Sequence, residues 1–386
     1  MIDIAIVGAG LTGLTCAQLL RGWGYTVAVF DKSRGLGGRV ATRRVGQTCF
    51  DHGARCLSQQ GSQTQQLIDT LLNGEQSAQP PQFLTNQTSE PIEPPVLVPW
   101  PRSPHQLHSS EDNQPLTSDP HESSQSYVPI AGMTAIAKFL SNGLDIRRQH
   151  RVTGLDANLT SHCWELKTDE PSQTIEPARA VILTLPAPQA VPLLEPLATV
   201  GLESPWIEQV RAVEFAPCFS VIGGYSAHTL PLQADPQTGL PLWSMGDRQW
   251  DALRCANDEM LAWIGVDSSK SRDAGEPIMV FQSTDTFAAA HADDLDVEAV
   301  GDRILKRAAH LLNCPALCDP QWRQVQRWRY AFCCKPLTNA TPYLVTQHPL
   351  LLGCAGDWCS GSQLEDALHS GRAIANHFHQ ALKQAE

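Results

Sequence analysis

The sequence predicts an α/β fold in two domains, on three observations. A short apolar run at residues 2–7 is followed by a glycine-rich turn, a helical pattern and a second apolar run at residues 27–30. The middle of the chain carries aromatic-rich strand patterns instead of further units of this kind. The length of 386 residues is enough for more than one hydrophobic core. We therefore expect a βαβ domain and a second, α+β domain built on a mixed or antiparallel sheet.

Composition argues against several classes of function. The net charge of -12 argues against a continuous positive surface that could bind nucleic acid. The twelve cysteines are scattered without paired CxxC spacing, which predicts no metal site and indicates a reducing compartment. No apolar run reaches the roughly 20 residues that a membrane span needs. The first residues carry Asp3 and no basic leader, so we interpret them as a strand and expect a cytoplasmic protein.

The turn after the first strand has the spacing of a dinucleotide-binding motif. Gly8 allows the sharp turn, Gly10 removes a side chain where a pyrophosphate must approach, and Gly13 lets helix and strand pack closely. Phosphate would then lie against the free N–H groups of the following helix. Asp31, 18 positions after Gly13, ends the next strand and can accept hydrogen bonds from ribose hydroxyls. The alternative is a strand-to-helix turn without a ligand.

A second glycine motif favours FAD over NAD. The segment DKSRGLGGR, residues 31–39, ends in a glycine pair and Arg39. A simple dehydrogenase site needs no such addition, whereas the longer cofactor can use Arg39 as a fixed cation on its pyrophosphate. The alternative is a flexible basic loop.

Two further segments suit the flavin half of such a cofactor. In FDHGAR, Gly53 and Ala54 leave room for a flat ring, and Arg55 faces either the flavin, a substrate phosphate or a surface carboxylate. Asp357 follows Gly356 between an apolar strand and the last helix, where it can bind polyol hydroxyls. The N-terminus of that helix can stabilise negative charge on a reduced ring. The alternative for this last segment is an ordinary capped helix.

Together these residues resemble the amine-oxidase branch of the glutathione-reductase-type FAD fold, and within it the renalase family. The similar stretches occur in family order over nearly the whole chain: VGAGLTGLTCAQLLR, DKSRGLGGR, FDHGA, YVPIAGMTAIAKFL, RVTGL, WELKT, AVILTLPAPQ, QRWRYA and CAGDWCSGSQLEDALHSG. The resemblance implies a Rossmann-like FAD domain, adenine contact through the backbone of Val152, and close helix packing at Gly371. The expected cofactor contacts are Gly8, Gly10, Leu11, Thr12, Gly13, Asp31, Lys32, Gly38, Arg39, Gly53, Ala54, Arg55, Val152, Gly356, Asp357 and Leu364.

The expected domain organisation is discontinuous. Residues 1–75, 129–190 and 336–386 form the FAD-binding domain, and residues 191–335 form the substrate domain. Between them, residues 76–128 are rich in Gln, Ser and Pro, which predicts a polar, partly flexible surface insertion without a counterpart in the family.

The resemblance implies a flavoenzyme that takes hydride at flavin N5 from a reduced nicotinamide dinucleotide, NAD(P)H or an isomer, and is reoxidised by O2 to give H2O2. Trp328 and Tyr330 are the expected substrate-side aromatics, with Arg55 beside them, although either aromatic could be a core residue. Residues Arg55 and Trp358 to Ser360 depart from the family pattern and put the substrate in doubt. The alternatives are an oxidase or desaturase of amines, carotenoids or porphyrins, and a non-catalytic flavin-binding protein. We expect non-covalent FAD and a small-molecule substrate; a covalent link through Cys333, Cys334 or Cys359 is the less favoured alternative.

Overall fold

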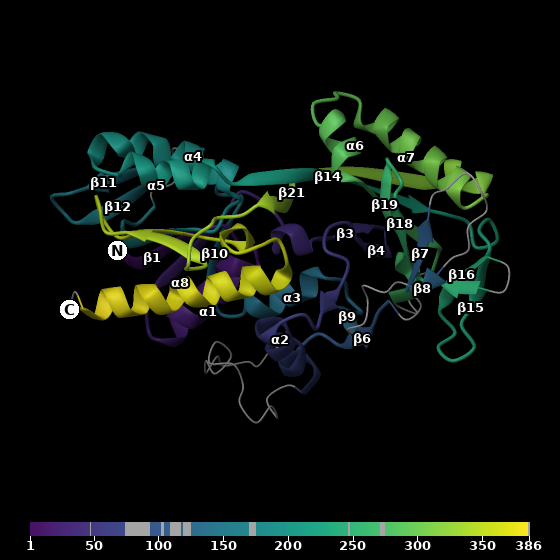
Figure 1. Cartoon of the computed structure of the whole chain (residues 1–386). Coiled ribbons are helices and arrows are strands. Elements are labelled where there is room, and N and C mark those ends of the chain that lie inside the picture. Colours follow the sequence, from purple (N-terminus) through teal and green to yellow (C-terminus); the bar gives the residue numbers. More distant parts are fainter. Residues whose placement is uncertain are drawn as a thin grey trace.

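Two large β-sheets organise the molecule (Figure 1). The computed structural model describes residues 1–46, 48–73, 93–101, 104–108, 117–118, 125–169, 175–245, 248–270 and 275–384. One sheet lies at the end of the molecule that carries both labelled termini, and the other lies at the opposite end, under α6 and α7. The predicted α/β class with a second sheet is confirmed.

The first sheet has eight strands, and five of them run parallel. The parallel strands are β1 (Ile2–Val7), β2 (Val27–Asp31), β10 (Asp145–Arg148), β13 (Ala178–Leu183) and β23 (Leu352–Ala355). The antiparallel strands are β11 (Val152–Asn158), β12 (Cys163–Thr168) and β22 (Tyr343–Thr346). Because successive side chains of a strand point to opposite faces, Ile4 and Ile6 enter one core while Ala5 and Val7 enter another. Both faces of this sheet are therefore covered.

Helices cover the two faces of the first sheet, as Figure 1 shows. On one face lie α1 (Leu11–Gly22), α3 (Thr134–Leu140) and α8 (Leu364–Gln384). On the other lie α4 (Ala187–Leu194), the 3-10 helix Glu195–Val200 and α5 (Ser204–Arg211). The last helix expected from the sequence is α8, and its long apolar face packs on α1.

The second sheet has seven strands and is antiparallel except for one parallel pair, β18 with β7, next to one edge. Its strands, in spatial order, are β21 (Trp322–Lys335), β14 (Glu214–Gly224), β20 (Ile278–Ser283), β19 (Leu261–Val266), β18 (Ala252–Ala256), β7 (Pro104–His108) and β8 (Thr117–Ser118). One face packs against α6 (Asp285–Ala290) and α7 (Val297–Leu311), with the 3-10 helix Pro315–Cys318 beside them. The other face carries Ile222, Trp263 and Val280, which belong to the same core as α1 and α8. That face therefore looks toward the first domain.

Short elements lie between the two sheets. They are β3 (Thr42–Val45), β4 (Thr48–Asp51), β5 (Leu57–Ser58), α2 (Ser62–Asn73), β6 (Leu97–Pro99) and β9 (Ser126–Pro129). A three-stranded sheet of β15 (Leu232–Ala234), β16 (Pro241–Met245) and β17 (Arg248–Trp250) flanks the second sheet, and three 3-10 helices span Gly38–Val40, Asp267–Lys270 and Asp357–Cys359.

Part of the range 76–128 joins the second sheet. β7 pairs in parallel with β18 of that sheet, and β6 pairs with β9. We expected only a polar surface insertion in this range, but its described residues also form paired strands. The rest of the range lies outside the described residues, and the domain boundaries given above stay predictions. No described helix is both long enough and apolar enough to cross a membrane.

Candidate functional site

The turn between β1 and α1 has an open position and a crowded one. A methyl group built on Gly13 would lie 2.0 Å from the carbonyl oxygen of Gly8, so only glycine lets α1 approach the turn. A methyl group on Gly10 would meet no atom within 4 Å. The start of α1, at Leu11 and Thr12, has no side-chain cap and no acidic residue in its first turn. Free N–H groups therefore face open space, an arrangement that suits a pyrophosphate.

Asp31 is held beside this turn by two backbone groups. Its carboxylate accepts from the N–H groups of Ala9 and Ser33, both at 2.7 Å. Each oxygen keeps a lone pair for a ribose hydroxyl. Lys32 is exposed, with its ammonium 3.5 Å from Gln189 Oε1. Val152 is buried at the start of β11. Two residues before it, the N–H of His150 donates to the carbonyl of Asp31. The residues predicted to contact the ribose and the adenine therefore lie close together.

Arg39 and Asp357, expected to hold different parts of the cofactor, bind each other. The Arg39 guanidinium donates to both carboxylate oxygens of Asp357 at 2.7 and 2.6 Å, and also to the carbonyl of Ala331. Asp357 is 3% exposed, whereas the Arg39 side chain is 31% exposed. The pair brings together the motif at Gly38, with its positive φ of 56°, and the motif at Gly356. The partly exposed guanidinium of Arg39 therefore lies between these two motifs.

The second of these motifs is fixed by α8. The Gly356 N–H donates to Ser370 Oγ at 2.9 Å, and Thr12 Oγ1 donates to the Ala367 carbonyl at 3.0 Å. A methyl group on Gly371 would lie 2.5 Å from the Thr12 carbonyl oxygen, so α1 and α8 touch through this glycine, as predicted. Leu364 is the first residue of α8 and is half-buried. The N-termini of α1 and α8 are thereby held in one unit.

The loop after β4 lies between Arg39 and the second sheet. The Ala54 N–H donates to the Arg39 carbonyl at 2.8 Å, and a methyl group on Gly53 would lie 2.0 Å from that same oxygen. Gln282 of β20 donates to the Gly53 carbonyl at 3.0 Å and accepts from Arg55 Nε at 2.7 Å. The Arg55 guanidinium lies 4.6 Å from the ring centre of Trp263, and its half-buried charge is fixed next to Gly53.

The two aromatic residues predicted on the substrate side have different surroundings. The Trp328 indole N–H donates to the His52 carbonyl at 2.8 Å, so Trp328 contacts the loop directly. Tyr330 packs edge-on against Phe215, whose ring lies 5.8 Å from the guanidinium of Arg39. Neither position is a deep core site, since both side chains are half-buried on β21.

Comparison with known proteins identifies the family. Residues 116–377 match the family model of flavin-containing amine oxidoreductases, and residues 6–71 match that of NAD(P)-binding Rossmann-like domains. This chain belongs to the flavin-containing amine oxidoreductase family. It is 23% identical to renalase from Mus musculus over 97% of this chain and 98% of that protein.

Solved structures show the same fold across the whole chain. Cyclohexylamine oxidase from Brevibacterium oxydans has a TM-score of 0.65 at 11% identity, and putrescine oxidase with bound putrescine has 0.65 at 12% identity; each alignment covers 99% of both chains. An Exiguobacterium protein assigned to protoporphyrinogen oxidase has 0.69 at 14% identity, over 98% of this chain and 99% of that one. The protein is an FAD-dependent oxidoreductase of renalase-like type, as the sequence predicted.

The described residues of this family member fit FAD. The uncapped start of α1, the open space at Gly10 and the oriented carboxylate of Asp31 match an ADP group. When bound, FAD supplies a hydride acceptor at N5. Within the described residues, no group of three or more His, Cys, Asp or Glu side chains could hold a metal ion.

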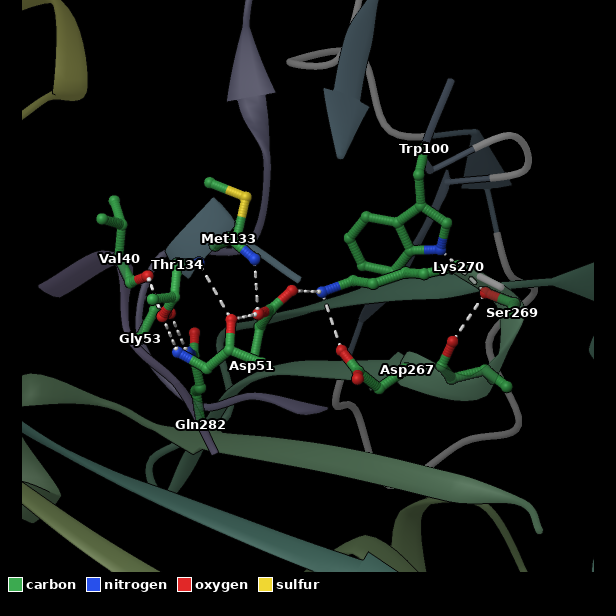
Figure 2. A network of polar contacts seen from close by, with 12 residues as sticks. Val40, Asp51, Gly53, Trp100, Met133, Thr134, Asp267, Ser269, Lys270 and Gln282 are labelled. Atoms are coloured by element: carbon green, nitrogen blue, oxygen red, sulfur yellow. Dashed lines mark hydrogen bonds and ion pairs between the residues drawn. The ribbon is translucent and has the colours of Figure 1, made fainter. Parts of the chain in front are cut away.

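Sequence reasoning missed a buried ionic cluster beside the loop (Figure 2). Lys270 Nζ lies 2.8 Å from Asp51 Oδ2 and 2.7 Å from Asp267 Oδ1, and 4.6 Å from the ring centre of Trp100. Lys270 stands in the polar stretch SSKSRD, which resembles an exposed loop. No local pattern could have shown that this lysine is buried.

His52 is the other unexpected feature of the loop. Its ring stacks on that of Trp328, and its Nδ1 is buried without a hydrogen-bond partner among the described residues. Burial, with a further contribution from the charge of Arg43, lowers the pKa of His52 to about 4. His52 is therefore neutral at physiological pH.

Proposed function

We propose that this enzyme oxidises a reduced nicotinamide dinucleotide, NAD(P)H or an isomer of it, in a renalase-like reaction. The donor's hydride would go to FAD, and O2 would then take two electrons and two protons, one proton from the reduced flavin and one from solvent, to give H2O2. The likeness to mouse renalase over nearly the full chain supports this proposal. The observation that carries it is the fixed cation of Arg55 beside Gly53.

Arg55 suits a substrate with phosphates or a carboxamide oxygen. Gln282 accepts a hydrogen bond from its Nε, and the guanidinium lies over the ring of Trp263, so the guanidinium is oriented before a substrate binds. A pre-oriented guanidinium loses little conformational entropy when it binds an oxygen ligand. The chain's part in the reaction is to hold the donor carbon at the ring and to exclude water, and no protein nucleophile is needed.

The amine-oxidase alternative is less favoured, because a protonated amine would meet a like charge at Arg55. Two buried carboxylates beside the loop, Asp51 and Asp267, are already bound to Lys270. A cationic substrate is therefore opposed here by electrostatics.

The polyene alternative would need an apolar tunnel. The face of the second sheet that looks toward the loop carries polar side chains in cross-strand register on four strands, with Trp263 of β19 standing between those of β20 and β18. These side chains are Gln326 on β21, Ser220 on β14, Gln282 on β20 and Arg254 on β18. The same face also carries Ile222, Trp263 and Val280, so it is the row that contains Gln282, the partner of Arg55, that favours a polar substrate.

We also propose that FAD is bound without a covalent link. Burial raises the pKa of Cys333 to about 12 and raises the pKa of Cys359 well above its usual value, with the charge of Asp357 acting in the same direction at both. A covalent link needs a thiolate, and these thiols stay protonated.

The test is an anaerobic titration of the FAD-loaded protein, followed by the flavin absorbance, with NADH, NADPH, their isomer-containing aged solutions, putrescine and a carotenoid. We expect fast bleaching by a nicotinamide dinucleotide and H2O2 formation on admitting air. Arg55→Gln should slow bleaching about 10- to 100-fold, since a hydrogen bond to a charged group contributes about 1.5–3 kcal/mol. Arg211→Gln, an exposed arginine on α5, should change nothing. Bleaching by the amine or the polyene alone would reject the proposal, and a flavin that no donor reduces would favour a non-catalytic flavin-binding protein.

A further inference from the structure

A buried cluster of one ammonium and two carboxylates joins the loop at Gly53 to the second domain (Figure 2). Its members Asp51, Asp267 and Lys270 are 4%, 5% and 6% exposed. Asp51 ends β4 of the first domain, whereas Asp267 and Lys270 stand on the 3-10 helix after β19 of the second. Trp100 covers the ammonium and donates from its indole N–H to Ser269 Oγ at 2.7 Å. The ion pairs are therefore shielded from water.

Asp51 connects this cluster to both segments that we expect to hold FAD. Besides Lys270, its carboxylate accepts from Thr42 Oγ1 at 2.6 Å and from the Met133 N–H at 2.9 Å. Thr42 exchanges hydrogen bonds with Thr134, whose hydroxyl donates to the carbonyl of Val40, next to Arg39. In the other direction along the chain, Asp51 leads directly into His52, Gly53 and Ala54. Lys270 thus contacts directly the residue that leads into the loop, and it is connected to the backbone of Val40 through Asp51, Thr42 and Thr134.

The cluster carries an unbalanced charge. Burial, together with the negative charge of Asp51, outweighs the attraction of Lys270 and raises the pKa of Asp267 to about 6. Burial acts to lower the pKa of Lys270, but the two carboxylates outweigh it and raise that pKa, so Lys270 stays charged. With Lys270 charged, protonation of Asp267 at lower pH makes the cluster one unit less negative.

Among the residues that the structure describes, few other charged groups face Asp267. From β4 it faces Asp51 and the thiol of Cys49, with Arg44 beyond that thiol. The described parts of β16 and β20, which also pack on this 3-10 helix, carry no titratable side chain. Lys270 is the cation in contact with it.

We infer that Lys270 is a positioning residue for FAD: through Asp51 it holds the loop from His52 to Arg55 in the shape that receives the ring. The charge of the cluster then influences the midpoint potential of the bound flavin. The inference rests on the proposed place of the ring at Gly53 and Ala54, and not on which donor reduces it.

The first test is FAD binding to the apoprotein of Lys270→Met, measured by flavin fluorescence at pH 8. Removing the ammonium leaves two buried carboxylates without a cation, which strains the loop, and we expect the Kd for FAD to rise about 10-fold or more. The matched control is Lys335→Met, because Lys335 makes an exposed ion pair with Glu214 on the second sheet; its Kd should stay within about 2-fold of the wild-type value. An unchanged Kd in a folded Lys270→Met protein would show that the cluster is only an interdomain contact.

The second test does not depend on the stability of that variant. We expect Asp267→Asn to have a more positive flavin midpoint potential than the wild-type protein at pH 8 and a smaller difference from it at pH 5. The reason is that removal of a nearby negative charge favours the more negatively charged reduced flavin, and the raised pKa of Asp267 makes more of the wild-type carboxyl protonated at pH 5. Equal potentials at both pH values would overturn the inference. Both tests use FAD and chemical reductants, so they can succeed even if no nicotinamide donor is found, and a protein that takes up no FAD would instead remove the proposed function itself.

Discussion

The ring of His52 lies nearly parallel to that of Trp328, with 5.2 Å between the centroids and an interplanar angle of 17°. The same indole donates its N–H to the His52 carbonyl. Strand β21 is thereby attached to the loop through both a stacking contact and a hydrogen bond, and these two contributions can be separated by substitution.

We expect Trp328→Phe to keep an aromatic ring against His52 but to lose the hydrogen bond, at a cost of about 1 kcal/mol in the free energy of unfolding. Trp328→Ala should cost about 3–5 kcal/mol if the site cannot close around the cavity. Thermal unfolding of the FAD-free proteins measures both. Equal effects of the two substitutions would mean that the hydrogen bond, and not the ring, makes the attachment.

His52 predicts an acid-sensitive stability. Its pKa falls from 6.5 to about 4 on folding, so between these values the unfolded chain takes up a proton that the folded protein does not. Stability is therefore lost as the pH falls, by about 2 kcal/mol at pH 5. His52→Asn removes the titration, and the difference between its melting temperatures at pH 7.5 and pH 5 should be smaller than that of the wild-type protein. Parallel losses in both proteins would contradict the neutral, buried imidazole.

Gly10 and Gly13 should respond differently to alanine. A methyl group on Gly13 would overlap the Gly8 carbonyl, so Gly13→Ala should lower the melting temperature of the apoprotein as well as its affinity for FAD. A methyl group on Gly10 enters open space, so Gly10→Ala should leave apoprotein stability nearly unchanged while it weakens FAD binding about 10-fold or more. If Gly10→Ala bound FAD normally, the pyrophosphate would lie elsewhere.

The Arg39–Asp357 pair predicts strong coupling in a double-mutant cycle. Arg39→Met leaves the buried Asp357 carboxylate without its guanidinium and should cost about 3–5 kcal/mol. Asp357→Asn should cost less, because Arg39 can reach solvent. The double variant should be more stable than the sum of the single effects predicts, by at least about 1 kcal/mol in thermal or urea unfolding. Additive losses would indicate that the two side chains do not interact in solution.

The sequence predicted those parts of the site that follow from short spacing. The glycines from Gly8 to Gly13 and the position of Asp31 depend on a single βαβ unit, in which local geometry fixes which groups meet. Gly371 was predicted from the family resemblance, and its contact with Thr12 gives the physical reason for that prediction.

Contacts between distant segments could not be predicted in the same way. Arg39 and Asp357 were each given a role on the cofactor, but their direct pairing needs two segments that are 318 residues apart to meet. Lys270 had no signal, because a buried lysine and an exposed one look alike in a polar stretch. β7 was missed for a similar reason, since the polar sequence PHQLH forms a strand only when β18 offers it an edge.

The close approach of α1 and α8 at Gly371 has a consequence for the order in which this protein can be made. The N-terminal βαβ unit contains the motif for the ADP half of FAD, yet its helix is supported by residues that are synthesised about 355 positions later. Loop closure over such a separation is slow compared with the formation of local turns. During synthesis, α1 of the N-terminal unit therefore lacks its contact with α8 until that helix has been made. The cofactor site with both of its helices in place can therefore form only after α8 has been synthesised.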